Sequence, residues 1–191
     1  RRQTFPSKRS PVDAADNIWT TDVNAHTVTK MSPEGQVLMT LGVRGQSGEW
    51  DETAGTRLLN QPNDVAVAAS GDLFVMQGHG RGQSRILKFD RTGRFLKSWG
   101  GNGTGPGQFD TGHSVAIDAR GLVYAADRQN RRVQIFDQDG TYLREWKFRG
   151  LPCGLYISPG GEMYLVTGFS GQILKLDADG RAVAATGQPG K

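Results

Sequence analysis

The sequence has few of the residues and motifs that are typical of scaffolds stabilised by disulfides or by metal ions. It has one cysteine, Cys153, so an internal disulfide and a zinc site built from cysteines are both excluded. No apolar run approaches the roughly 20 residues that a transmembrane helix needs, and no signal-peptide hydrophobic region is present. The P-loop, the G-x-S-x-G elbow and the C-x-x-C pair are also missing, so the chemistries that they mark are not indicated.

Charge of one sign is only slightly in excess, since 23 Lys and Arg residues stand against 19 Asp and Glu residues, for a net charge of +4. Apart from Arg1, Arg2, Lys8 and Arg9, the basic residues are scattered along the chain. The aromatic residues, 8% of the total, occupy repeat positions and do not alternate with a basic stripe. This distribution is typical of a solvated surface, so we expect no nucleic-acid partner and no membrane partner.

Glycine is the residue in excess, with 27 in 191 residues, which favours many tight turns at positive φ. The clearest unit runs from Gln108 to Trp146 and contains four short apolar runs. Each run alternates apolar with polar or small residues between Asp, Asn and Gly, which predicts antiparallel strands joined by tight turns. The runs are residues 115–117, 122–126, 133–136 and 142–146.

Four copies of this unit make up the chain. One bulky residue recurs in the second strand of each copy, at Trp19, Phe74, Tyr124 and Tyr164, and one turn glycine recurs before each fourth strand, at Gly35, Gly93, Gly140 and Gly180. The copies cover about residues 8–42, 60–100, 107–147 and 151–187. A polar, glycine-rich connection of residues 43–59 marks either a functional loop or a tolerated insertion. Radially repeated four-stranded meanders are the blades of a β-propeller, so we predict one all-β propeller domain over residues 1–191.

The repeat is interrupted at both ends of the sequence. No apolar first-strand run precedes Val12, and the sequence after Gly187 stops inside the linker that elsewhere leads to the next copy. We therefore expect a truncated part of a larger propeller in preference to a complete four-bladed ring. An open arc would expose apolar blade faces and two sheet edges, so self-association through these edges is expected.

Three segments resemble the NHL repeat: a G-x-G-P-G-Q-F linker at residues 103–109, a D-x-x-N-x-R-V-Q-I-F run at residues 127–136 and a D-x-D-G turn at residues 137–140. Within that group, the chain is similar to the bacterial relatives of peptidylglycine (peptidyl-α-hydroxyglycine) α-amidating lyase, and the matching segments are residues 19–26, 62–67, 112–116 and 126–130. The resemblance implies a six-bladed propeller with a zinc ion held by three histidines at its axis, an arginine and a tyrosine beside the zinc, and a calcium ion in the channel. The implied reaction splits a peptidyl-α-hydroxyglycine into an amidated peptide and glyoxylate.

The resemblance assigns roles to a few residues of this chain. His113 matches one zinc-binding histidine, Lys8 stands where a second is expected, and the third would lie in a blade outside this sequence. Arg128 matches the family's arginine and would hold the substrate carboxylate, while His79, in a glycine-rich bulge, stands in the place of the catalytic tyrosine. Asn63 shares the column of His113 and is expected to face the channel and contribute to substrate binding.

Each candidate also has a plain structural interpretation. His113 is alternatively a channel histidine hydrogen-bonded to the backbone, and His79 a solvent-facing loop residue. Arg128 is alternatively the ion-pair partner of Asp127 or of another loop acid. His26 lies at a hairpin turn, where a structural role is expected.

Two functions are consistent with these residues. The first is a zinc-dependent carbon–nitrogen lyase of the amidating type, with calcium implied only by the family resemblance. The second is a non-catalytic NHL module whose propeller face binds a peptide, a protein or a small ligand. Both imply a peptide or small-molecule partner, and the resemblance suggests an extracytoplasmic or secreted location.

Overall fold

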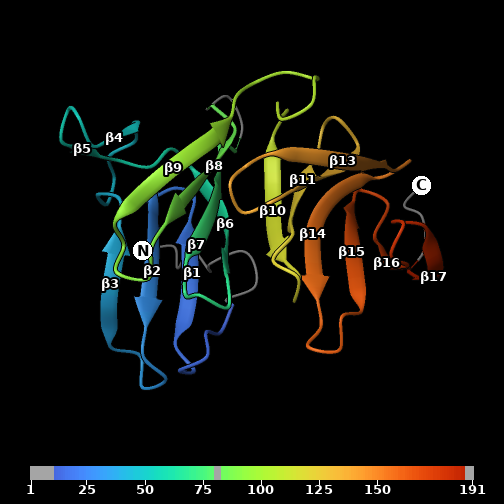
Figure 1. Ribbon diagram of the computed structural model, residues 1–191, viewed down its shortest axis with the longest axis horizontal. Coiled ribbons are helices and arrows are strands. Elements are labelled where there is room, and N and C mark those ends of the chain that lie inside the picture. Colours follow the sequence, from blue (N-terminus) through green and yellow to red (C-terminus); the bar gives the residue numbers. More distant parts are fainter. Residues whose placement is uncertain (1–10, 80–82, 188–191) are drawn as a thin grey trace.

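Short antiparallel strands joined by tight turns make up the described part of the chain, residues 11–79 and 83–187 of a computed structural model (Figure 1). These residues form strands numbered β1 to β17 and contain no α-helix, which confirms the predicted all-β class. Within the same residues, no helix is long and apolar enough to cross a membrane.

All strands except β4 and β5 form four successive sheets, called here blades 1 to 4. Within each blade the strands are antiparallel and hydrogen-bonded in chain order. Blades 2 to 4 have four strands each, and blade 1 has three, with an isolated bridge between Val12 and Ile18. Blades 1 and 2 contain β1 (Ile18–Asp22), β2 (Thr27–Met31), β3 (Val37–Leu41), β6 (Pro62–Val67), β7 (Leu73–Gln77), β8 (Arg85–Phe89) and β9 (Phe95–Gly100). Blades 3 and 4 contain β10 (Gly112–Ile117), β11 (Val123–Asp127), β12 (Arg132–Phe136), β13 (Tyr142–Lys147), β14 (Leu151–Ile157), β15 (Met163–Gly168), β16 (Gln172–Leu176) and β17 (Ala182–Thr186).

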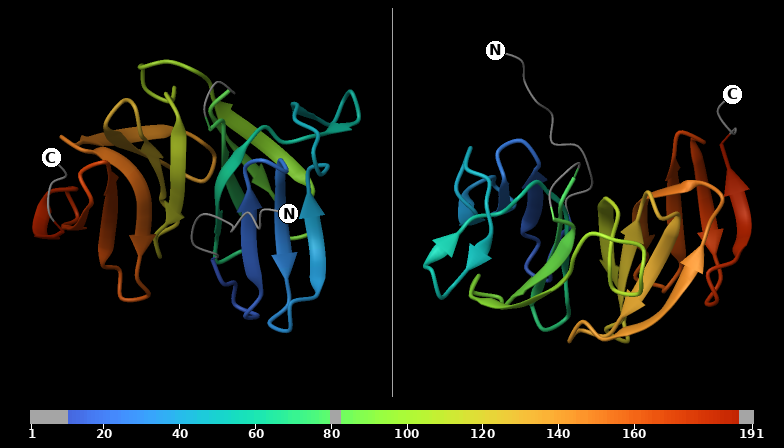
Figure 2. Two further views of the ribbon diagram at one scale, coloured as in Figure 1. Left: turned by 180° about the vertical axis from the view of Figure 1, so that it is seen from behind. Right: turned by 90° about the horizontal axis from the view of Figure 1, so that it is seen from above.

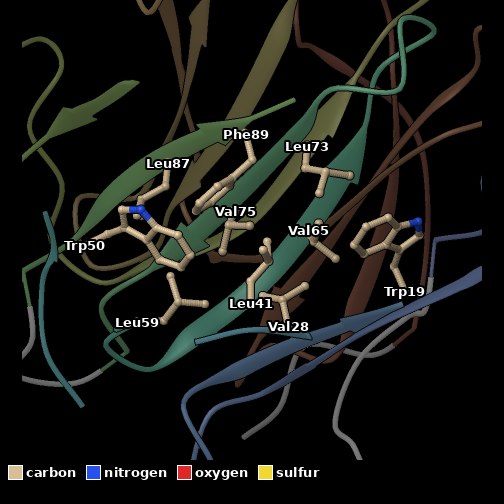
Figure 3. Packing of buried hydrophobic residues seen from close by; sticks show 10 residues of the cluster. All are labelled: Trp19, Val28, Leu41, Trp50, Leu59, Val65, Leu73, Val75, Leu87 and Phe89. Atoms are coloured by element: carbon tan, nitrogen blue, oxygen red, sulfur yellow. The ribbon is translucent and has the colours of Figure 1, made fainter. Parts of the chain in front are cut away.

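The hydrophobic core lies between neighbouring blades. Because side chains alternate between the two faces of a sheet, each blade has one apolar face toward the preceding blade and one toward the following blade. Two clusters fill the interfaces of blades 2 and 3 and of blades 3 and 4. Full burial of a large apolar side chain contributes about 1.5–3 kcal/mol, so these interfaces hold the blades in place. The cluster between blades 1 and 2 contains Trp19, Val28, Leu41, Trp50, Leu59, Val65, Leu73, Val75, Leu87 and Phe89 (Figure 3).

The blades form an open arc around a common axis (Figure 2). The first strands of neighbouring blades contact one another in the order β1, β6, β10 and β14. Three clusters join the four blades, and none of them unites described residues of blade 1 with residues of blade 4. The outer faces of the two end blades are consequently exposed, as shown by the exposed fractions of Leu38 (52%) and Ile173 (45%).

The connection formed by residues 43–59 folds back onto the first core. It contains a short hairpin of β4 (Trp50–Asp51) and β5 (Thr56–Arg57). Trp50 packs edge-on against Phe89, with ring centroids 4.7 Å apart, and Leu59 is fully buried. The segment is therefore part of the core, a role that its polar, glycine-rich composition did not indicate.

A buried ion pair anchors the linker between blades 2 and 3. Asp127 is fully buried and accepts a hydrogen bond from Nε of Arg132 at 2.7 Å. The same guanidinium donates to the carbonyl oxygens of Gly105 and Gln108, each at 2.9 Å, and Asn130 donates to Asp127 at 2.8 Å. Burial raises the pKa of the Asp127 carboxyl, while the hydrogen bonds from Asn130 and Arg132 oppose that rise. The D-x-x-N-x-R run thus fixes the linker onto blade 3.

Aspartates at the tight turns accept backbone hydrogen bonds, as turn-forming aspartates do. In the turn between β10 and β11, Oδ1 of Asp118 accepts from the amides of Arg120 and Leu122, each at 2.9 Å. Its Oδ2 accepts from the Tyr124 hydroxyl at 3.0 Å and from the Arg120 guanidinium at 2.9 Å. The same two-amide pattern recurs at Asp90, Asp137 and Asp177.

Acidification is expected to destabilise the fold through Asp118. Burial by itself raises the pKa of this carboxyl, but hydrogen bonds from the Leu122 amide, Arg120 and Tyr124 outweigh it and hold the pKa below its ordinary value. Because the folded pKa lies below the unfolded value of about 3.9, the carboxylate stabilises the fold above that pH. This contribution is lost as the pH falls through the folded pKa. Urea unfolding at about pH 6 and about pH 3 should show a smaller acid-dependent loss in Asp118→Asn than in the wild type, and equal losses would contradict the assignment.

Candidate functional site

A β-bulge displaces one residue at the start of three inner strands. The register between the first and second strands shifts at the same place in blades 2, 3 and 4. Bulges re-aim side chains and are frequent beside active sites. The displaced residues are those of the column predicted to face the channel, namely Asn63, His113 and Cys153.

The ring of His113 is hydrogen-bonded to the next blade. The side chain is 6% exposed, and its Nδ1 lies 2.7 Å from the carbonyl oxygen of Cys153. Since a carbonyl can only accept, Nδ1 carries a proton, and a neutral ring in this tautomer has its lone pair on Nε2. A histidine that ligates a metal through Nε2 has this arrangement. The backbone hydrogen bond expected as the alternative role of His113 is present, and it is compatible with the predicted ligand role.

His79 lies beside His113. It follows β7, its side chain is half-buried, and the two ring centroids are 5.4 Å apart with an angle of 42° between the planes. Residues 80–82 of the glycine-rich bulge lie outside the described residues. The structure therefore brings together two imidazoles from different blades, and a purely solvent-facing position for His79 does not hold.

Arg128 lies at the same end of blade 3 and forms no ion pair with Asp127, whose carboxylate is engaged by the buried network. Its backbone amide donates to the carbonyl of Thr111, two residues before His113. Its guanidinium lies over the ring of Phe169 in blade 4, with Cζ 5.2 Å from the ring centroid. Its Nε is buried and has no hydrogen-bond partner among the described residues. This nitrogen is thus a buried donor whose partner is not among the described residues.

Phe169 is a site residue that the sequence reasoning missed. Its side chain is 81% exposed, and its φ of 62° lies in the left-handed region. That conformation is rare for a bulky residue, and strained residues cluster at ligand sites. The sequence contained one signal for this residue. At the turn position where the third copy has Gln129, the fourth copy has a large aromatic residue.

Asn63 is engaged in joining two blades. It is 2% exposed, and its Nδ2 donates to the Gly112 carbonyl oxygen at 2.6 Å. The main-chain carbonyl oxygen of Asn63 accepts a hydrogen bond from the Thr21 hydroxyl at 3.0 Å. The side-chain nitrogen is thus committed to the backbone of blade 3, and the predicted substrate-binding role of Asn63 stays a prediction.

A polar relay missed by the sequence reasoning links three inner strands behind these residues. The Ser114 hydroxyl donates to Oδ2 of Asp64 at 2.5 Å, and the Val115 amide donates to the same oxygen at 3.1 Å. The amide of Leu155 donates to Ser114 Oγ at 3.1 Å. The relay fixes β6, β10 and β14 relative to one another, and so fixes the positions of the bulged residues.

The described residues bring together fewer candidate ligands than a catalytic zinc requires. Such sites take three protein ligands and one water, whereas two imidazoles, those of His79 and His113, lie close together here. Cys153 presents its carbonyl to His113, and its thiol lies against Gly168. Lys8, expected in the ligand column, lies outside the described residues. Elsewhere in the described chain there is likewise no group of three His, Cys, Asp or Glu residues suited to zinc or calcium, so the donor set is incomplete for either metal.

Comparison with curated proteins finds homologues in two groups. The chain is 36% identical over 135 residues to NHL repeat-containing protein 3 of Homo sapiens, a match that covers 68% of this chain and 38% of that protein. It is 34% identical over 168 residues to peptidyl-glycine alpha-amidating monooxygenase B of Xenopus laevis, covering 82% of this chain and 18% of that protein. It is 32% identical over 175 residues to peptidyl-alpha-hydroxyglycine alpha-amidating lyase 1 of Drosophila melanogaster, covering 82% and 31%. The chain thus spans less than two fifths of each of these relatives.

The fold has known structural counterparts. A streptogramin B lyase structure matches with a TM-score of 0.66 at 16% identity, over 94% of this chain and 54% of that chain. No protein-family model matches the sequence. The described residues form a β-propeller arrangement of four blades, and the homologues of the chain include NHL repeat-containing protein 3 and the peptidylglycine amidating enzymes, which confirms the predicted propeller class and the resemblance to these proteins.

Proposed function

We propose that this NHL propeller binds the C-terminus of a peptide that ends in α-hydroxyglycine, and that it is related in function to the amidating lyases among its homologues. The main support for this proposal is that Nε of Arg128, near the two imidazoles, is buried and has no hydrogen-bond partner among the described residues. A planar guanidinium with an unused donor suits a carboxylate, which it can hold through two parallel hydrogen bonds. The C-terminal carboxylate of such a peptide fits that requirement.

The two imidazoles suit proton transfer at the neighbouring carbon. In the proposed reaction, Nε2 of His113 or a nitrogen of His79 accepts the hydroxyl proton of the α-hydroxyglycine. The oxygen electrons form the carbonyl of glyoxylate, the carbon–nitrogen bond breaks toward nitrogen, and the nitrogen takes up a proton to give the amide. A hydrogen bond to the Cys153 carbonyl would stabilise the proton on Nδ1 of His113 throughout.

Zinc, when bound, would supply Lewis-acid polarisation of the hydroxyl oxygen. His113 through Nε2 and His79 are the residues that would hold it, and the described chain offers no third ligand. No step is therefore assigned to the metal.

Arg128→Lys is expected to weaken binding of a peptide with a C-terminal carboxylate about 10- to 150-fold, since a hydrogen bond to a charged group contributes about 1.5–3 kcal/mol. Calorimetry with a glycine-extended peptide measures this change. The matched control is Arg94→Lys, an exposed arginine in the turn between β8 and β9 at the opposite end of a blade, which should leave the affinity unchanged. The same peptide with a C-terminal amide should bind the wild type as weakly as the carboxylate peptide binds Arg128→Lys.

Glyoxylate release from an α-hydroxyglycine peptide, measured with and without added zinc, tests the catalytic part. Release that is lost in His113→Ala supports the lyase assignment. No binding of either carboxylate peptide by the wild type would overturn the proposed function as a whole.

A second candidate is a non-catalytic NHL module that binds a carboxylate-bearing ligand with the same residues. The homology to NHL repeat-containing protein 3 supports it. Peptide binding that depends on Arg128, without glyoxylate release at any zinc concentration, would favour this candidate over the lyase.

A further inference from the structure

An open cavity of about 510 Å³ lies between blades 3 and 4. One wall is the end of β13 with the linker that follows it, and the other is β16 with the turn that leads to β17. Both walls belong to neighbouring blades of this chain, and any further blade would pack on the opposite face of the blade 4 sheet. The volume is within the range of ligand-binding pockets.

In the two preceding interfaces, the linker between the blades inserts an apolar side chain. The linker between blades 2 and 3 turns back on itself through a parallel bridge of Asn102 with Phe109. The linker between blades 1 and 2 does the same through a parallel bridge of Ser47 with Leu59. Phe109 and Leu59 are both fully buried, so each linker contributes to the core of its interface.

The linker between blades 3 and 4 makes no such loop. It consists of residues 148–150, between β13 and β14. Phe148 is half-buried against the edge of the core cluster, and Arg149 is exposed. The segment that the repeat would place in the cavity is therefore part of the described chain, and it leaves the cavity open.

Smaller side chains in blade 4 also enlarge this space. In blades 2 and 3, one ladder pair of the third and fourth strands is aromatic, namely Phe89 with Phe95 and Phe136 with Tyr142. The linker residues Trp50 and Phe109 pack on these pairs, with ring centroids 4.7 Å and 6.0 Å from the ring of the third strand. The same ladder pair in blade 4 is Leu176 with Ala182. Blade 4 therefore lacks aromatic rings at the two positions where blades 2 and 3 have them.

The rim of the cavity has an excess of positive charge. Three cationic side chains line it, those of Lys147, Arg149 and Arg181, together with two carboxylates. The carboxylates are already paired, Glu145 with Lys147 at 3.4 Å and Asp179 with Arg181 at 3.0 Å. Within the described ranges, Arg149 forms no ion pair. An acidic group that enters beside an apolar one would thus meet a cation.

We propose that this cavity binds an extended peptide segment of a partner protein, which inserts one aromatic side chain between blades 3 and 4 and places an acidic residue at the cationic rim. The segment would supply at this interface the insertion that the chain's own linkers supply at the other two. The proposal is independent of the proposed function, because none of His79, His113 and Arg128 lines the cavity.

A synthetic peptide with the sequence of residues 102–110 is the probe, because it is the chain's own inserting linker and ends in Phe109 and Asp110. With an acetylated N-terminus and an amidated C-terminus, its one carboxylate is that of Asp110, so it does not test the site proposed for C-terminal carboxylates. Calorimetry should show saturable one-to-one binding. The Phe109→Ala peptide should bind about 10- to 100-fold more weakly, because an aromatic side chain contributes most through its burial. The Asp110→Asn peptide should bind about 3- to 10-fold more weakly.

Matched variants of the protein locate the binding site. Ala182→Phe, which places in the cavity the kind of ring that blades 2 and 3 carry, should weaken binding at least about 10-fold. Val183→Phe is its control, at a neighbouring position that is 60% exposed and does not line the cavity. Arg181→Glu should weaken binding about 3- to 10-fold, whereas Arg94→Glu, at the same turn position in blade 2, should leave it unchanged. The two arginine side chains are similarly exposed, at 76% and 74%.

Four results would overturn the proposal. They are no saturable binding up to about 1 mM peptide, unchanged affinity in Ala182→Phe, equal losses in Ala182→Phe and Val183→Phe, and binding of N-acetylphenylalanine as tight as that of the peptide. The last result would identify a site for small aromatic acids in place of a peptide site. All four protein substitutions are at exposed positions, and an unchanged thermal transition checks that each variant folds.

Discussion

Asp127→Ala is expected to lower the free energy of unfolding by about 3–5 kcal/mol, the range found when one partner of a buried ion pair is removed. The carboxylate is fully buried and accepts hydrogen bonds from Arg132 at 2.7 Å, Asn130 at 2.8 Å and the Asp110 amide at 2.7 Å. Without it, the Arg132 side chain, which is 5% exposed, loses its main counter-charge. Glu145 does not replace that charge, because it contacts Arg132 at the edge of the network, where the Glu145 side chain is 20% exposed.

Urea unfolding of the two proteins measures this loss. Asp139→Ala is the matched control, since its side chain is 81% exposed at a turn and the change should stay within about 0.5 kcal/mol. A loss of less than about 1 kcal/mol in Asp127→Ala would show that the network relaxes around the gap or admits water. The same variant should also make the linker between blades 2 and 3 more accessible to proteolysis, because the linker carbonyls depend on Arg132.

Gly140→Ala is expected to cost about 2–4 kcal/mol, and Gly35→Ala only about 1 kcal/mol. The two glycines occupy the same turn in different blades and have nearly the same φ, 84° and 86°. A Cβ on Gly140 would meet the Trp99 ring at 2.6 Å, whereas nothing lies within 4 Å of a Cβ on Gly35. The backbone strain is therefore shared, and the difference between the variants reports the contact between the turn and the preceding blade.

Thermal unfolding of both variants separates the two contributions. Equal losses would mean that the Trp99 ring moves aside at little cost, and that positive φ alone explains the glycine. Gly180, where an added Cβ would meet the Trp146 ring, offers an independent repeat of the comparison.

The blades were predictable because two patterns mark each strand in the sequence. Apolar and polar residues alternate along the strand, and the strand recurs at the same place in each copy of the repeat. The bulky column of Trp19, Phe74 and Tyr124 was identified from spacing alone, and each of these residues is buried at a blade interface. The turn glycines were identified for their positive φ, but their second role as contact points for Trp99 and Trp146 was not visible. That role depends on which blade follows which in space, and one copy of the repeat does not encode it.

The connection of residues 43–59 shows a second limit of sequence reasoning. Its composition is polar and rich in glycine, so no periodic pattern marks Trp50 or Leu59 as core residues. They are buried because the loop returns to the same interface from which it departs. A contact of this kind depends on the tertiary structure, so it leaves no pattern in the local sequence.

The candidate site was predictable in part. His79, His113 and Arg128 were named from the family resemblance, and the structure places the two histidines 5.4 Å apart and leaves an Arg128 donor without a partner. The contact between Arg128 and Phe169 was not foreseen, because the two residues lie in different blades and only the arginine belongs to a known motif. The hydrogen bond of Asn63 to Gly112 likewise depends on the distance between neighbouring inner strands.

The contacts between neighbouring blades hold the array together, and one of them also fixes the tautomer of a histidine in the candidate site. In a chain of repeats, stability comes largely from the interfaces between nearest neighbours, and parts of such an array can open locally. His79, His113 and Arg128 belong to central blades, but the carbonyl that fixes the tautomer of His113 belongs to Cys153 in blade 4. Transient detachment of blade 4 would release that ring to carry its proton on either nitrogen. A local opening between blades 3 and 4 would thus act on the tautomer of a residue in the candidate site.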